Sequence, residues 1–166
     1  MELLSRFFEE PDMSYFLFGP RGTGKSTWLK STHKDALYID LLHPEAFRRL
    51  SARPERLLEI IEGNPEKKKV IIDEVQKLPI LLDFVHKIIE EKKEVKFILT
   101  GSSSRKLKRS GVNLLAGRAA NKTFHPFIAA ELGDEFSLEN SLLYGMIPLV
   151  CKSKNPLETL NAYLSL

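Results

Sequence analysis

The sequence predicts an α/β fold in which a mainly parallel, five-stranded sheet lies between two layers of helices. Three observations support this prediction. Short apolar runs typical of buried strands alternate with longer segments of helical periodicity. A glycine-rich loop follows the first apolar run, and an acidic pair follows the third. Continuous apolar strands that are separated by helices indicate a parallel sheet covered on both faces.

The expected strands are short, apolar and rich in β-branched or aromatic residues. They cover residues 15–18, 36–40, 70–73, 95–100 and 119–124. Helices are expected where apolar side chains recur at helical spacing, or where a proline can occupy the first turn. They cover residues 25–32, a segment from 44, 54–62, 80–92, 127–132, 138–144 and 157–166. Each crossover between parallel strands is expected to be right-handed.

Length and composition are those of one ordinary globular domain, with 166 residues, 43% of them hydrophobic and 28% charged. A chain of this size buries about 70% of the surface that it exposes when unfolded. Its single cysteine, Cys151, excludes an internal disulfide and a cysteine-rich metal site. The chain has no apolar run of the roughly 18 residues that span a membrane and no secretory signal at its start. We therefore expect a soluble, cytoplasmic protein with no membrane partner.

Charge alone does not identify a partner. The net charge of +3 is too small to argue for nucleic-acid binding. The basic run at residues 105–109 is expected to be a solvated helix face rather than a contact for nucleic-acid phosphates. The four histidines lack the spacing of metal ligands and are expected to be structural.

Residues 19–26 read GPRGTGKS and match the phosphate-binding pattern G-x-x-x-x-G-K-[ST]. Glycines let successive backbone N–H groups approach a polyphosphate, and the following helix directs its positive N-terminus toward the same charge. Lys25 is expected to bridge the β- and γ-phosphates of ATP, and the Ser26 hydroxyl is expected to hold Mg²⁺. The predicted nucleotide-binding residues are Gly19, Pro20, Arg21, Gly22, Thr23, Gly24, Lys25, Ser26 and Thr27.

Two acidic residues, Asp73 and Glu74, follow the apolar run of the third predicted strand. A carboxylate at this position can reach Mg²⁺ through water, which makes Asp73 the expected metal-binding acid beside Ser26. Glu74 is well placed to polarise an attacking water as a general base. Gln76 follows closely and is a candidate for a hydrogen bond to a phosphate or to a neighbouring loop.

The fourth predicted strand breaks into small hydroxyl side chains after Leu99. Thr100 and Ser102 are both candidates for orienting water and contacting the γ-phosphate, and the sequence does not choose between them. Ser103 or Ser104 is expected to cap a helix. Polar side chains are therefore expected at this end of the sheet.

Arg118 places a cation immediately before the fifth predicted strand. It is a candidate for stabilising transition-state charge, either in its own site or in that of a neighbouring subunit. The second arrangement implies a homo-oligomer. The alternative is that Arg118 forms a structural ion pair.

These motifs predict a module that binds and hydrolyses ATP and so drives a conformational change. A GTPase is disfavoured because residues 121–123 read Asn-Lys-Thr and are followed by Phe124, where guanine recognition needs an aspartate. Two alternatives stay open: a nucleotide-dependent interaction module with little or no turnover, and a small-molecule phosphotransferase. The phosphotransferase is less favoured because the sequence shows no arginine-rich lid. Phe7, Phe8 and nearby residues are candidates for lining an adenine pocket.

Several segments of the chain together resemble bacterial and archaeal AAA-type ATPases that carry a C-terminal domain of unknown function. These segments are residues 16–29, 38–42, 72–77, 99–103, 114–118 and 126–132. The resemblance implies a P-loop three-layer α/β/α sandwich. In that fold, the strand ending at Thr100 lies between the phosphate-loop strand and the acidic strand. The resemblance also implies ATP, Mg²⁺ and hydrolysis.

The same resemblance bears on domain organisation. Members of this family are usually far longer, with a C-terminal half expected to recognise a protein or nucleic-acid partner. This chain ends at Leu166, where that half would begin. We therefore expect residues 1–133 to form a P-loop AAA-type ATPase domain. Residues 134–166 are expected to form a short helical extension that starts a truncated further domain.

Overall fold

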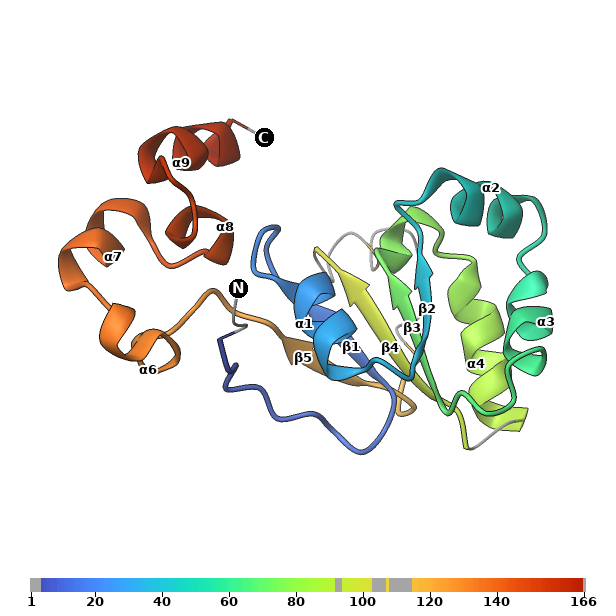
Figure 1. The fold of residues 1–166 in the computed structure, drawn as a ribbon. Coiled ribbons are helices and arrows are strands. Elements are labelled where there is room, and N and C mark those ends of the chain that lie inside the picture. Colours follow the sequence, from blue (N-terminus) through green and yellow to red (C-terminus); the bar gives the residue numbers. More distant parts are fainter. Residues whose placement is uncertain (1–3, 92–93, 103–106, 108–114, 166) are drawn as a thin grey trace.

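The computed structural model describes residues 4–91, 94–102, 107 and 115–165. Within these residues, the centre of the molecule is a five-stranded sheet of order β2-β3-β4-β1-β5 in which all pairs of neighbouring strands are parallel (Figure 1). The strands are β1 (Tyr15–Phe18), β2 (Leu37–Asp40), β3 (Lys69–Asp73), β4 (Lys96–Gly101) and β5 (Ala120–Thr123). The predicted α/β fold is confirmed. So is the position of the strand that contains Thr100, because β4 lies between β1 and β3.

Two helical layers cover the sheet, because side chains along each strand alternate between its faces. The helices beside the sheet are α1 (Lys25–Thr32), α2 (Pro44–Ala52), α3 (Arg56–Glu62) and α4 (Leu81–Glu91), with a 3₁₀ turn η1 (Val75–Lys77). Phe16 and Phe18 of β1 pack in one apolar cluster with α2, α3 and α4. Tyr15 and Leu17 pack in a second cluster with Leu29 of α1. Both clusters exclude water from the strands, so the strand ends are held rigidly.

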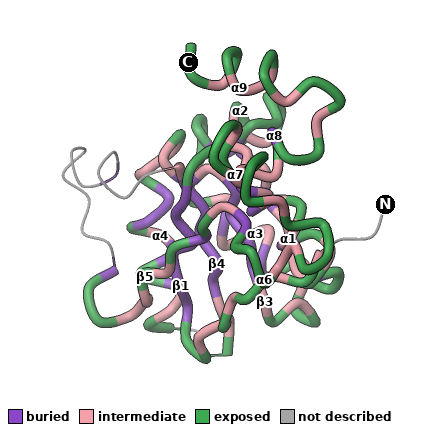
Figure 2. Tube along the Cα trace, turned by 90° about the vertical axis from the view of Figure 1, so that its left-hand side faces the viewer, coloured by how far each residue is buried: buried purple, intermediate pink, exposed green. Residues whose placement is uncertain are grey.

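The chain beyond β5 forms short helices set to one side of the sheet (Figure 1). They are α6 (Ala129–Leu132), the 3₁₀ turn η2 (Gly133–Glu135), α7 (Leu138–Tyr144), α8 (Pro148–Cys151) and α9 (Pro156–Leu164). Figure 2 shows that buried residues concentrate in the strands, whereas α7 and α9 contain none. Helix α8 was not predicted, because Pro148 follows Gly145 and suggested a break. In the structure, that proline occupies the first turn of a helix.

Residues 4–14 form an arm without helix or strand. The ring of Phe8 packs against those of Tyr15, Trp28 and Phe124, so the arm lies along α1 and the end of β5. The sequence patterns did not predict this arm. Among the helices that the structure describes, none has the length and apolar character needed to cross a membrane.

Candidate functional site

The phosphate-binding pattern forms the loop between β1 and α1, at the carboxyl end of the sheet. Gly24 caps α1 with a φ of 87°, a left-handed conformation that favours glycine. A Cβ on Gly19 would collide with the carbonyl group of Phe124. The Thr23 hydroxyl donates to the Pro20 carbonyl oxygen at 2.9 Å and closes the turn. The loop therefore has the backbone freedom and the helix N-terminus that anion binding requires.

Lys25 is the buried cation of this loop, with 6% of its surface exposed. Its Nζ donates to the carbonyl oxygens of Gly19 at 2.6 Å and Pro20 at 2.9 Å. Burial lowers the pKa of Lys25, and the charges of Glu74 and Asp73 oppose that shift. The ammonium group is thus hydrogen-bonded to neutral carbonyls, which compete weakly with a phosphate for a cation.

Asp73 ends β3 and is 2% exposed. Its two carboxylate oxygens accept hydrogen bonds from the hydroxyl groups of Thr100 and Tyr38. Burial raises the pKa of Tyr38, and the Asp73 hydrogen bond and charge raise it further, while a hydrogen bond with Ser26 lowers it. The Tyr38 hydroxyl therefore lies between the two residues expected to hold a metal. The sequence analysis did not single out Tyr38, because its aromatic ring fitted the pattern of a buried strand.

The donor set here fits a magnesium ion that arrives with a nucleotide. A hydroxyl from Ser26 and a carboxylate from Asp73 are oxygen donors of the kind that Mg²⁺ prefers. Nowhere in the described part of the chain do three or more His, Cys, Asp or Glu side chains group as a metal site. Mg²⁺ is commonly bound by one or two protein groups together with substrate phosphates, so this sparse set is sufficient.

Glu74 adopts a left-handed backbone conformation, with φ 61° and ψ 44°. Such a conformation costs energy for a residue with a Cβ and is concentrated at functional sites. The Glu74 N–H donates to the Thr100 hydroxyl at 2.9 Å, and its carboxylate accepts from the Gln76 side chain. Thr100 thus links both acidic residues. Ser102, the other candidate of the strand end, lies half-buried beyond β4 and is not joined to Asp73 by a hydrogen bond that the structure records.

Arg118 does not lie with these residues. It precedes β5, which is parallel to β1, so it stands at the amino end of the sheet, opposite the phosphate loop. There its guanidinium forms an ion pair with Glu90 of α4. A role for Arg118 in its own site is therefore unsupported by the geometry. Ser103, Ser104 and the basic run 105–109, except Leu107, lie outside the described residues.

A cavity of 420 Å³ adjoins the phosphate loop. Residues on its wall include Arg6, Gly22, Thr27, Trp28, Phe127 and Leu149. The two predicted aromatic residues are not on this wall. Phe7 is 74% exposed, and Phe8 packs into the aromatic cluster of the arm. Of the residues near them in sequence, Leu4 and Arg6 do line this cavity.

Arg6 joins the phosphate loop to the C-terminal helices. Its guanidinium donates to the carbonyl oxygens of Thr23 at 2.9 Å and His125 at 2.6 Å, and pairs with Glu131 at 3.1 Å. It also lies 4.1 Å from the centre of the Phe124 ring. These partners are 17 to 125 residues away in sequence, so no local pattern could have revealed them.

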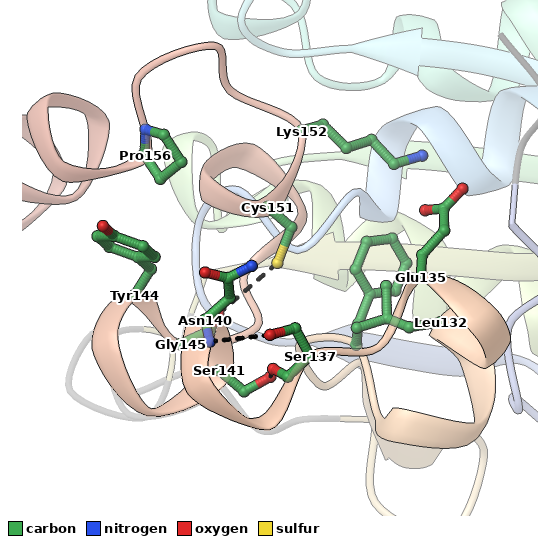
Figure 3. A pocket seen from close by; sticks show the side chains of 11 residues that line it. Leu132, Glu135, Ser137, Asn140, Ser141, Tyr144, Gly145, Cys151, Lys152 and Pro156 are labelled. Atoms are coloured by element: carbon green, nitrogen blue, oxygen red, sulfur yellow. Dashed lines mark hydrogen bonds between the residues drawn. The ribbon is translucent and has the colours of Figure 1, made fainter.

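A second cavity, of 160 Å³, lies among the C-terminal helices (Figure 3). The Ser137 hydroxyl caps α7 there, accepting from the Asn140 N–H at 3.2 Å. The Cys151 sulfur lies 3.7 Å from the Gly145 carbonyl oxygen, and burial raises the pKa of its thiol. A protonated thiol is a poor nucleophile and metal ligand. This cavity therefore does not compete with the phosphate loop as a candidate site.

Comparisons with known proteins identify the family of this chain. A family model described as an AAA domain matches residues 12–133. No curated protein matches the sequence. Among solved structures, domain III of the Thermotoga maritima replication initiation protein DnaA resembles this chain with a TM-score of 0.43 and 15% identity, over 92% of this chain and 74% of that one. That likeness is distant, and we draw no conclusion from it. Because the family model spans most of the chain, including the phosphate loop and Asp73, this protein belongs to the AAA-domain family of P-loop ATPases.

Proposed function

We propose that this chain binds ATP with Mg²⁺, hydrolyses it, and couples hydrolysis to a conformational change. The observation that supports this most is the arrangement of Lys25, Asp73 and Glu74. A buried ammonium held by carbonyls lies near a buried carboxylate held by hydroxyls, and the second carboxylate follows directly. A phosphate and a divalent cation together would match both charges better than these neutral partners do.

The phosphate loop supplies binding. Its backbone N–H groups and the N-terminus of α1 would contact the phosphate oxygens, and Lys25 would exchange its carbonyl partners for the β- and γ-phosphates. The adjoining cavity would receive the base and the ribose. Trp28 and Phe127 form an apolar part of the cavity wall, which suits a flat heteroaromatic ring.

Ser26 and Asp73 would hold the magnesium ion, which when bound neutralises charge on the β- and γ-phosphates. Thr100 keeps the Asp73 carboxylate oriented through its hydroxyl group. Glu74 would accept a proton from the attacking water. Each of these roles uses a side chain at the carboxyl ends of β3 and β4 or the start of α1.

Arg118 is proposed to act across a subunit boundary in a homo-oligomer. Its position at the amino end of the sheet argues against a role in its own site, while its ion pair with Glu90 fits the structural alternative, so a mixing experiment must decide. Mixing Arg118→Ala protein with Glu74→Gln protein should restore part of the phosphate release, because mixed assemblies contain some complete sites. If no mixing ratio restores activity, the role across the boundary is wrong.

A nucleotide-dependent interaction module remains the second candidate. It is favoured by exposed apolar side chains on α7, where Leu138, Leu142 and Leu143 are 64%, 79% and 59% exposed. Patches of this kind commonly mark interaction surfaces. This candidate requires ATP binding but little turnover.

Phosphate release distinguishes the candidates. We expect steady hydrolysis by the wild-type chain, and a Glu74→Gln loss of about 10²- to 10⁴-fold because the general base is removed. Binding of a non-hydrolysable ATP analogue should survive in the same variant. Tight binding without turnover in the wild type supports the interaction module instead. ATP consumption only after a small acceptor is added supports a phosphotransferase.

A further inference from the structure

Gln76 has one end of its amide paired and the other end unpaired. Its Nε2 donates to the Glu74 carboxylate. Its Oε1 is buried and has no hydrogen-bond partner among the residues that the structure describes. An ionised carboxylate only accepts hydrogen bonds, so the contact with Glu74 identifies which end of the amide bears the hydrogens. A buried acceptor is therefore left unsatisfied directly beside the candidate general base.

Buried acceptors without a partner are rare in native proteins, and each calls for an explanation such as a missing water or a role in catalysis. The position of this one is informative. A Cβ on buried Gly101 would lie 2.7 Å from the Gln76 Oε1. Gly101 ends β4, immediately after Thr100. The absence of a side chain at residue 101 thus leaves room for the amide oxygen at the strand end nearest the acidic pair.

The Gln76–Glu74 pair lies at the same edge of the sheet as the phosphate loop. Glu74 directly follows Asp73, the last residue of β3, and β3 is parallel to β4. Strand β4, which contacts the amide through Gly101, pairs directly with β1, the strand that leads into the loop. The unpaired oxygen consequently belongs to the same end of the sheet as the proposed phosphate site.

The Gln76 Oε1 only accepts hydrogen bonds, and this limits which ligands it can bind. It is an acceptor and so cannot bind a phosphate oxygen, which is also an acceptor. The Glu74 carboxylate beside it is an acceptor as well. These two neighbouring acceptors can each accept one of the two hydrogens of a single water molecule, and that arrangement leaves a lone pair of the water oxygen free to attack.

We propose that Gln76 is a catalytic residue that positions the attacking water, with its Oε1 and the Glu74 carboxylate each accepting one of the two water hydrogens. This inference rests on the proposed ATP hydrolysis. The water oxygen bonds to the γ-phosphorus, and the bond from that phosphorus to the β–γ bridging oxygen breaks. Its electron pair leaves on ADP. The proton facing Glu74 passes to the carboxylate, and the hydrogen facing Gln76 remains on the product phosphate.

The first test compares Gln76→Ala with Lys77→Ala, the neighbouring exposed residue. We expect Gln76→Ala to lower the single-turnover rate about 10²-fold, because the water loses one of its two anchors. The Kd for a non-hydrolysable magnesium–ATP analogue, measured by calorimetry, should stay within about twofold of the wild type, since Gln76 contacts no phosphate. Lys77→Ala should change neither quantity.

The second test separates direct contact with water from an effect exerted only through Glu74. If Gln76 merely holds Glu74, then Gln76→Ala should cost nothing further in a Glu74→Gln background. The proposal instead expects a further fall of about tenfold in the single-turnover rate of the double variant. A Gly101→Ala variant should lower the rate in the wild-type background, because its Cβ displaces Oε1 while both partners remain.

Two results would overturn the proposal: a Gln76→Ala rate equal to that of the wild type, or no further loss in the Glu74→Gln background. Both leave the proposed ATP hydrolysis intact. A wild-type chain that binds the nucleotide and releases no phosphate removes the hydrolysis and this inference together, so the two failures are distinguishable.

Discussion

The two ends of the sheet hold their charged groups in different ways. At the amino end, the Glu10 carboxylate lies 2.7 Å from the Lys96 ammonium and 3.3 Å from that of Lys69. At the carboxyl end, Lys25 is bonded to carbonyls and Asp73 to hydroxyls. In an ion pair, each charge is neutralised by a partner within the fold. Neutral partners do not neutralise a charge, so it stays available to a ligand of opposite sign. The first end therefore ties the chain together, and the second is prepared for binding.

This difference has a cost that falls on one end only. Burial disfavours the charged form of Lys25 and lowers its pKa, so keeping this lysine charged costs the unliganded fold stability. Functional sites commonly retain such locally unfavourable groups. The predictions below test whether ionic and neutral partners separate structure from function in this way.

The largest effect on stability is expected at Arg6, which forms an ion pair with Glu131 and donates a hydrogen bond to the phosphate loop. The side chains of Arg6 and Glu131 are 7% and 4% exposed. Arg6→Ala leaves Glu131 buried without its cation, and we expect the free energy of unfolding to fall by about 3–5 kcal/mol. Urea denaturation measures this, with the exposed loop residue Arg21→Ala as control. An Arg6→Ala protein as stable as its control would show that this pair does not stabilise the fold.

Opposite effects on stability are expected for two lysines. Lys96→Met removes the nearer of the two lysine partners of Glu10 and should lower the free energy of unfolding by about 1.5 kcal/mol. Lys25→Met removes a buried charge that has only carbonyl partners, and should leave the stability of the unliganded chain equal or higher. Urea denaturation of both variants without nucleotide measures the two changes in the free energy of unfolding. A Lys25→Met protein less stable than Lys96→Met would contradict the contrast between the ends.

The amino end should also respond to acid. Burial lowers the pKa of His33 below its ordinary 6.5; nearby Glu10 opposes the shift, and Lys69 and Lys96 add to it. The unfolded chain then binds a proton first as the pH falls, so His33 contributes stability above pH 6.5 that is lost below it. The pKa of Glu10 is also lowered and adds a loss below its ordinary 4.5.

Denaturation at about pH 7.5 and about pH 5.5 should therefore show a drop in stability that is smaller in a His33→Gln variant. The variant cannot gain a proton at residue 33, so that part of the pH dependence disappears. An equal drop in both proteins would mean that His33 is not the titrating group.

The smallest effect on stability is expected at Arg118. Its ion pair with Glu90 has side chains that are 39% and 53% exposed. Exposed pairs of this kind contribute about 0–1 kcal/mol, because water and salt screen them. Arg118→Ala should therefore unfold almost as the wild type does. A large loss would make Arg118 a structural residue and weaken its proposed role across a subunit boundary.

Features that depend on residues next to one another in the chain were predictable from the sequence. The phosphate loop, the strand before Asp73 and the helix after Lys25 each follow from local pattern. Contacts across the chain were not predictable in this way, because Tyr38 meets Asp73 across 35 residues and Arg6 meets Glu131 across 125. Arg118 is a different case. Its place at the amino end follows from the parallel direction of β5, whereas the sequence patterns predicted only that the sheet is mainly parallel.

Calorimetric titration of magnesium–ATP into the wild-type chain, Lys25→Met and Lys96→Met compares the two ends of the sheet most directly, because it measures nucleotide affinity. We expect saturable heat for the wild type and for Lys96→Met. Affinity should fall about 10- to 100-fold for Lys25→Met, because a charged hydrogen bond to phosphate contributes about 1.5–3 kcal/mol. Equal affinity in all three proteins, or no heat from the wild type, would show that the carboxyl end of the sheet is not a nucleotide site.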